Sequence, residues 1–189
     1  DGANVGVQIM LISGALVTVA SDGSASYDPN GAFEALAVGD MTTDTFTYQI
    51  DDGNGGTATA TVSVVINGVN DAPDAVNDDF GVAVDATLSG NVLDYNGNGE
   101  DMDVDASDVL AVTQLNGSSA ALGVATTIAS GAEVTLNADG TFTYDQNGAF
   151  SGLGVGVTAT DTIGYTISEG TGGTDTANET ITIGASSLT

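Results

Sequence analysis

The chain has 189 residues and a formal net charge of −26, because it contains 26 Asp and Glu residues and no Lys, Arg or His. This composition excludes ion pairs between side chains, and it excludes nucleic acids and anionic membranes as partners, since both are bound through Lys and Arg. The absence of Cys excludes disulfides and thiol catalysis.

From the N-terminus onward, the chain contains short segments that are typical of β-strands. Residues 5–20 are apolar and uncharged, but they are too few to span a membrane, and Ser13-Gly14 predicts a turn between two strands. Many short strands separated by Asp-Gly, Asn-Gly and Gly-Gly turns predict an all-β fold of Greek-key sandwiches. Period-two alternation is clearest in three segments, 46–50, 59–66 and 141–144.

The chain contains an internal repeat. Residues 13–18 recur as residues 130–135, and the correspondence continues without a gap for about fifty residues. Residues 74–117 have no counterpart in the first copy. We therefore expect two domains, the later part of one repeat over 1–69 and a complete repeat over 70–189, with the first sandwich incomplete in this chain.

A linker rich in oxygen side chains joins the two copies. Asn70 and Asp71 stand directly before Ala72-Pro73, and proline restrains both itself and its predecessor to extended backbone. Asn and Asp supply the oxygen ligands that calcium takes, and no cationic side chain is present to neutralise the carboxylates. The linker is therefore predicted to be a stiff connector that binds Ca²⁺.

Seven segments in order along the chain share the features of one known repeat: 22–23, 27–33, 44–48, 52–56, 70–73, 90–93 and 103–108. Together they resemble the VCBS repeat, a cadherin-like module found in tandem in large bacterial surface and secreted proteins. The resemblance implies an extracellular Ig-like or cadherin-like sandwich at the bacterial cell surface. It also implies calcium at the domain joints and an adhesive or structural role.

The predicted strand order brings carboxylates toward the linker. A hairpin of residues 45–50 and 57–66 puts Asp44 at the linker end and Asp52 at the opposite end. In the second repeat, one strand leaves Pro73 and the next returns, so that the acidic loop 94–108 comes back to the linker. We expect an interdomain calcium cluster with ligands from three directions: Asp44, Asn70, Asp71, Asp103, Asp105 and Asp108.

The same loop holds a second calcium-like pattern. Asp94, Asn96, Asn98 and Glu100 reproduce the alternating oxygen spacing of an EF-hand loop, and Asp105 falls at the twelfth position. No flanking helices are predicted. Either this loop binds an ion of its own, or it is a solvated loop rich in turn-forming residues.

Catalysis is disfavoured because only carboxylates and hydroxyls remain for acid–base or nucleophilic work. We expect a non-catalytic structural module, part of an adhesin stalk or an extracellular fibre, whose partners are neighbouring repeats or identical subunits placed end to end. One alternative is a filament subunit whose first sandwich is completed by a strand from its neighbour. A second is an adhesin domain for an unidentified cell-surface or matrix ligand.

Overall fold

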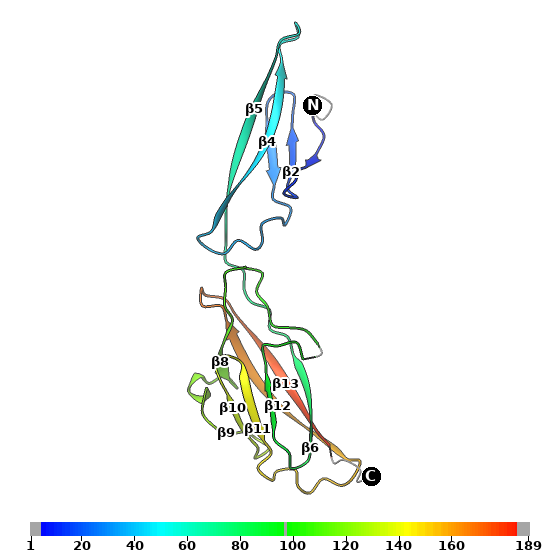
Figure 1. The fold of residues 1–189 in the computed structure, drawn as a ribbon, viewed down its shortest axis with the longest axis vertical. Helices are drawn as coiled ribbons and strands as arrows, with labels where there is room; N and C mark the ends of the chain where they lie inside the picture. The colour runs from blue at the N-terminus through cyan, green and yellow to red at the C-terminus, as the bar shows by residue number, and fades with distance from the viewer. Residues whose placement is uncertain (1–4, 97, 185–189) are drawn as a thin grey trace. The chain divides into compact units, whose positions relative to one another are not determined.

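The computed structural model describes residues 5–96 and 98–184. The chain divides into two compact units: the first is Asp1–Asn70 with Asp105–Ser107, and the second is Asp71–Val104 with Asp108–Thr189. Both units consist of β-sheets (Figure 1), so the predicted all-β fold is confirmed. Within the described ranges there is one short 3-10 helix, η2 (Ser119–Ala121), and no helix long and apolar enough to cross a membrane.

The first unit contains two small antiparallel sheets. Its Ser-Gly turn forms as predicted, with the Gly14 N–H donating to the Leu11 carbonyl at 3.0 Å. The long hairpin also forms, and its register places Met41 opposite Asn67 at one end and Asp51 opposite Thr57 at the other. The sheets are β1 (Ile9–Met10), β2 (Leu16–Val19) and β3 (Ala25–Asp28), and separately β4 (Met41–Asp51) and β5 (Thr57–Asn67).

The second unit contains two four-stranded sheets. One has the order β7-β11-β10-β9 and the other the order β6-β13-β12-β8, in which β6 and β13 run parallel. The strands of the first sheet are β7 (Leu88–Asn91), β9 (Thr126–Thr127), β10 (Glu133–Leu136) and β11 (Thr141–Asp145). Those of the second sheet are β6 (Asp78–Ala83), β8 (Ala111–Leu115), β12 (Thr158–Ser168) and β13 (Thr174–Gly184).

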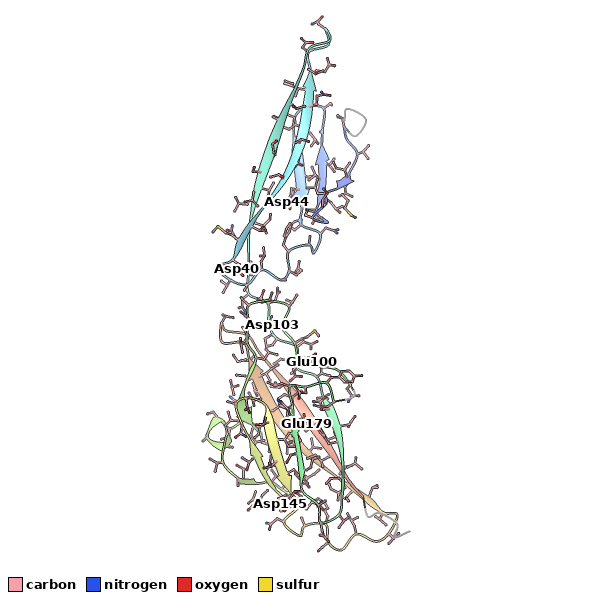
Figure 2. The ribbon with its side chains drawn as sticks, viewed as in Figure 1. Asp40, Asp44, Glu100, Asp103, Asp145 and Glu179 are labelled. Carbon is pink, nitrogen blue, oxygen red and sulfur yellow. The ribbon has the colours of Figure 1, made fainter. Side chains whose placement is uncertain are left out.

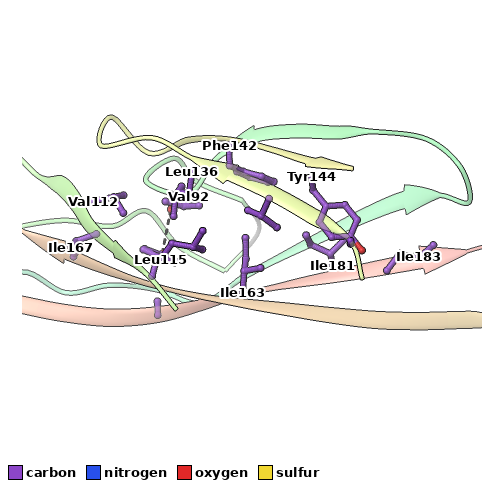
Figure 3. Close-up of a cluster of buried hydrophobic side chains, with 14 residues drawn as sticks. Val92, Val112, Leu115, Leu136, Phe142, Tyr144, Ile163, Ile167, Ile181 and Ile183 are labelled. Carbon is purple, nitrogen blue, oxygen red and sulfur yellow. Dashed lines mark hydrogen bonds between the residues drawn. The ribbon is translucent and has the colours of Figure 1, made fainter. Parts of the chain in front are cut away.

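The core of the second unit lies between these two sheets. Inward residues of β11, including Phe142 and Tyr144, face Ile163 and Ile181 of β12 and β13 (Figure 3). Alternate residues of the long strands point inward because successive side chains of a strand leave opposite faces. This packing makes the second unit a complete β-sandwich.

The first unit leaves the equivalent face uncovered. Tyr48 and Ile50 of β4 are 37% and 60% exposed, whereas their repeat equivalents Tyr165 and Ile167 of β12 are 2% and 0% exposed. Tyr165 and Ile167 are buried in a core that includes Val92 after β7 and Val112 of β8, and the described residues of the first unit include no counterpart of β6, β7 or β8. In their place the first unit has an open cleft of about 780 Å³ that Phe46, Ile50 and other apolar residues line.

Candidate metal centre

The acidic loop 94–108 lies between β7 and β8 and belongs to the second unit, except for Asp105–Ser107, which are grouped with the first. Asp74 and Met102 form an isolated antiparallel bridge, in which each residue's N–H donates to the other's carbonyl, at 2.9 and 3.1 Å. The bridge fixes the loop beside the residues that follow Pro73. Within this unit, the loop therefore returns to the linker as the strand order predicted.

Three carboxylates of this loop come together, and we call Asp103, Asp105 and Asp108 the loop cluster. One carboxylate oxygen from each lies within 4.8 Å of the others. Asp105 is buried, Asp103 (Figure 2) and Asp108 are half-buried, and the Thr171 hydroxyl donates to Asp108 Oδ2 at 3.1 Å. Three like charges at this spacing repel one another, and a hard divalent cation with oxygen ligands relieves that repulsion. The loop cluster therefore has the donor set of a calcium site.

Asp44 has hydrogen-bond donors inside the first unit. Its Oδ2 accepts from the Ser13 hydroxyl at 2.6 Å and from the Tyr27 hydroxyl at 2.9 Å, and its Oδ1 accepts from the Thr45 N–H at 2.8 Å. The hydrogen bond from Ser13 is the main cause that lowers the pKa of Asp44. These bonds tie β4 to β3 and to the turn after β1, so Asp44 has a structural role in addition to the predicted metal ligation.

Asp52 lies at the opposite end of the β4–β5 hairpin from the linker, as predicted. Its Oδ1 accepts from the N–H groups of Asn54 and Gly56, at 2.8 and 2.9 Å, which closes the hairpin turn. In the second repeat, Glu169 takes this place, and its Oε1 accepts from the N–H of Gly173. This carboxylate position shapes the turn in both units.

The EF-hand-like segment is attached to the start of β6. Asn96 Nδ2 donates to Asp78 Oδ2 at 3.2 Å, and Asn98 Nδ2 donates to Asp79 Oδ2 at 2.9 Å. The side chains of Asp94 and Glu100 are exposed. The two amides thus turn toward carboxylates of β6, and an ion within this segment stays a prediction.

The linker residues Asn70 and Asp71 are both half-buried, and the division between the two units falls between them. They make interactions in the folded chain. Their predicted convergence with Asp44 and the loop cluster spans both units and stays a prediction.

The structure also reveals a second acidic group that the sequence did not predict. Asp78, Asp101 and Glu179 are 1%, 6% and 0% exposed in the second unit, and we call them the buried acidic group. Burial, reinforced by the neighbouring charge of Asp78, raises the pKa of Glu179 to about 9, and burial also raises the pKa of Asp78 and of Asp101.

One sequence signal could have identified this group. Inward positions of β13 alternate through Ala177, Glu179, Ile181 and Ile183, all of them buried. The first repeat has Val62 where the second has Glu179. A single charged residue in an inward apolar series, with an apolar residue at the matching repeat position, indicates a special site.

Two β-sheet units, the second a complete sandwich with its acidic loop beside a proline-containing linker, are the architecture of a cadherin-like module. The chain belongs to the bacterial cadherin-like domain family, whose model matches residues 1–68 and again residues 70–185. Cadherin-like domains are typically extracellular structural or adhesive modules, typically bind calcium and are generally non-catalytic.

Solved structures that are similar to the chain include two animal cadherin-like structures, and no curated protein matches it. Mouse clustered PcdhgC3 EC1-3 has 14% sequence identity and a TM-score of 0.37, over 90% of this chain and 51% of that one. Zebrafish RET cadherin-like domains 1 to 4 have 14% identity and a TM-score of 0.28, over 90% of this chain and 39% of that one. The chain thus spans about half the length of the mouse structure and less of the zebrafish one.

Proposed function

We propose that this chain is a calcium-binding structural module of the VCBS type, without catalytic activity, in the stalk of a bacterial surface adhesin or in an extracellular fibre. Calcium bound by the loop cluster and the linker carboxylates stiffens the joint between the two units. The neighbours of the module are further repeats or identical subunits, arranged end to end.

The loop cluster is the observation that carries this proposal. Its three carboxylates lie within 4.8 Å of one another in a chain that has no Lys, Arg or His to neutralise them. Calcium accepts about six to eight oxygen ligands, including backbone carbonyls and bidentate carboxylates, so an acidic loop suits it. The same composition leaves few groups for catalysis, which supports a structural role.

Calcium titration of the whole chain tests the proposal. A ligand that binds only the native state raises the free energy of unfolding, by about 2.7 kcal/mol when its free concentration is about 100 times Kd. We expect calcium to raise the melting temperature of the wild-type chain, and the variant Asp103→Asn/Asp105→Asn/Asp108→Asn to lose most of that rise.

Glu133→Gln is the matched control. Glu133 is exposed on β10 of the same unit, so this variant removes a negative charge outside the loop cluster. If the loop variant and the control respond equally to calcium at matched ionic strength, the loop cluster does not carry the effect of calcium and the proposed site is wrong.

A filament subunit is the second candidate function, and the open cleft of the first unit favours it. The cleft lies along β4, where Tyr48 and Ile50 are exposed and the β12 equivalents are buried in the core. An extended strand from a neighbouring copy fills such a cleft and satisfies the free edge of a sheet. Cover by another repeat of the same polypeptide is the competing arrangement, and the mass of the particles in solution distinguishes the two.

A further inference from the structure

The buried acidic group is assembled from three separate parts of the second unit. Asp78 begins β6, Glu179 lies directly opposite it in the parallel pairing of β6 with β13, and Asp101 comes from the loop after β7. Figure 2 marks Glu179 within the sheet region of this unit, away from its turns. None of these residues belongs to the loop cluster.

Hydrogen-bond donors reach only some of the carboxylate oxygens of the buried acidic group. Asp101 accepts from the Val76 N–H at 2.7 Å and from the Tyr165 hydroxyl at 2.9 Å, and Asp78 Oδ2 accepts from Asn96 Nδ2 at 3.2 Å. Asp78 Oδ1 and both carboxylate oxygens of Glu179 are buried without a hydrogen-bond donor. Three acceptor atoms of two adjacent carboxyl groups are therefore buried without a donor, and such atoms are strongly destabilising unless something binds them.

The residues around the buried acidic group contribute further oxygen atoms and no positively charged side chain. The Tyr165 hydroxyl lies 3.0 Å from the Val76 carbonyl and 3.3 Å from the Val92 carbonyl, in addition to its bond to Asp101. One hydroxyl hydrogen thus serves three acceptor oxygens. Since the chain has no Lys, Arg or His, the negative charge of this pocket is neutralised either by a bound proton or by a cation from solvent.

The two repeats differ at the position of Glu179. The first repeat has Val62 where the second has Glu179. An isolated glutamate at an inward strand position would be destabilising, so the three acids are best explained together.

We propose that Asp78, Asp101 and Glu179 form a binding site for a calcium-type divalent cation inside the second unit. The chemistry favours calcium over magnesium, because Mg²⁺ keeps several waters whereas Ca²⁺ accepts carboxylates and backbone carbonyls in place of its waters. The ion joins β6, β13 and the loop after β7, and so it serves as an internal staple in a chain that has no disulfide.

Calorimetric calcium titration of the full chain, together with melting in calcium and in chelator, tests this site. Glu179→Gln removes the charge and keeps the shape, and Glu179→Val introduces the residue that the first repeat carries at this position. We expect each variant to bind one ion fewer per chain than the wild type. Each should also melt higher than the wild type in chelator, because the uncompensated buried carboxylate is gone, and gain less from calcium.

An unchanged number of ions and an unchanged calcium-dependent rise in melting temperature in a Glu179 variant would overturn the proposal, and would indicate a proton shared by Asp78 and Glu179. If neither Glu179 variant folds, calcium titration of the variant Asp103→Asn/Asp105→Asn/Asp108→Asn tests the buried site instead. We expect it to keep the ion of the buried acidic group, and a folded loop variant that binds no calcium would exclude that site. Because the two sets of variants share no residue, failure of the loop cluster and failure of the buried site give different results.

Discussion

Asp161 in β12 accepts the same pair of hydroxyl hydrogen bonds as its repeat equivalent Asp44. Its Oδ2 receives the Ser130 hydroxyl at 2.5 Å and the Tyr144 hydroxyl at 3.0 Å. Tyr144 is fully buried in β11 of the opposite sheet, and burial is the main cause that raises its pKa. The bond therefore joins the two sheets of the sandwich at one residue, which explains why the aspartate, the serine and the tyrosine recur together.

Tyr144→Phe should destabilise the second unit by about 1.5 kcal/mol, because it removes one hydrogen bond to a charged acceptor and leaves the ring in place. Asp161 keeps its bond from Ser130, so the loss should lie at the low end for such bonds. Urea denaturation measures the change in the free energy of unfolding. Tyr48→Phe is the control, since Tyr48 is 37% exposed, and equal effects of the two substitutions would contradict the role of the inter-sheet bond.

At the scale of single elements, the Asp-Gly turn between β10 and β11 does more than reverse the chain. Gly140 has a positive φ of 82°, and a Cβ at this position would meet Asn91 Oδ1 and the Leu93 side chain. The matching turn of the first repeat has Gly23 at φ 87° with nothing within 4 Å. The two turns thus share their backbone conformation and differ only in what packs against them.

Gly140→Ala should therefore destabilise its hairpin more than Gly23→Ala destabilises the other. The unfavourable φ is common to both and costs about 1–2 kcal/mol, whereas the overlap with Asn91 and Leu93 adds about 1–3 kcal/mol at Gly140 alone. Hydrogen exchange, followed on peptides that cover each hairpin, measures the loss of protection in each variant. Equal losses would mean that the end of β7 does not contact the turn.

The strands and hairpins could be predicted because their signals are local. Alternation in residues 59–66 and the turn residues after Asp51 together specify β5 and its pairing with β4. The loop cluster could also be predicted, since its three aspartates are close together in the sequence. In the buried acidic group, only Glu179 has a local signal, because it interrupts an apolar inward series; its partners could not be predicted, since the parallel pairing that places Asp78 opposite Glu179 joins distant segments.

The direction of side chains in the acidic loop was equally hard to anticipate. The spacing of Asn96 and Asn98 matches a calcium loop, but their amides donate hydrogen bonds to Asp78 and Asp79. Spacing specifies which residues are near one another along the chain, whereas the fold of the second unit decides which acceptor each amide meets. The EF-hand-like spacing thus indicated which residue types the loop contains, but not the direction in which their side chains point.

For the whole molecule, the net charge of −26 dominates the physics of association and stiffness. Like charges without intervening cations repel, which keeps a protein soluble and also strains any compact joint. Divalent ions bound at carboxylate clusters lower this repulsion locally, so calcium should change how the two units move relative to each other more than it changes either fold.

Small-angle X-ray scattering of the full chain tests this expectation. We expect calcium to narrow the distribution of interatomic distances, and Asp71→Asn/Asp103→Asn to keep it broad, because those two carboxylates belong to the linker and to the acidic loop. Glu133→Gln should respond to calcium like the wild type, since its charge lies outside the joint. If the double variant narrows as much as the wild type, calcium does not stiffen the joint through these residues. The forward scattering from the same samples gives the particle mass, so a calcium-dependent rise to multiples of 18.5 kDa would favour the filament subunit over the stalk module.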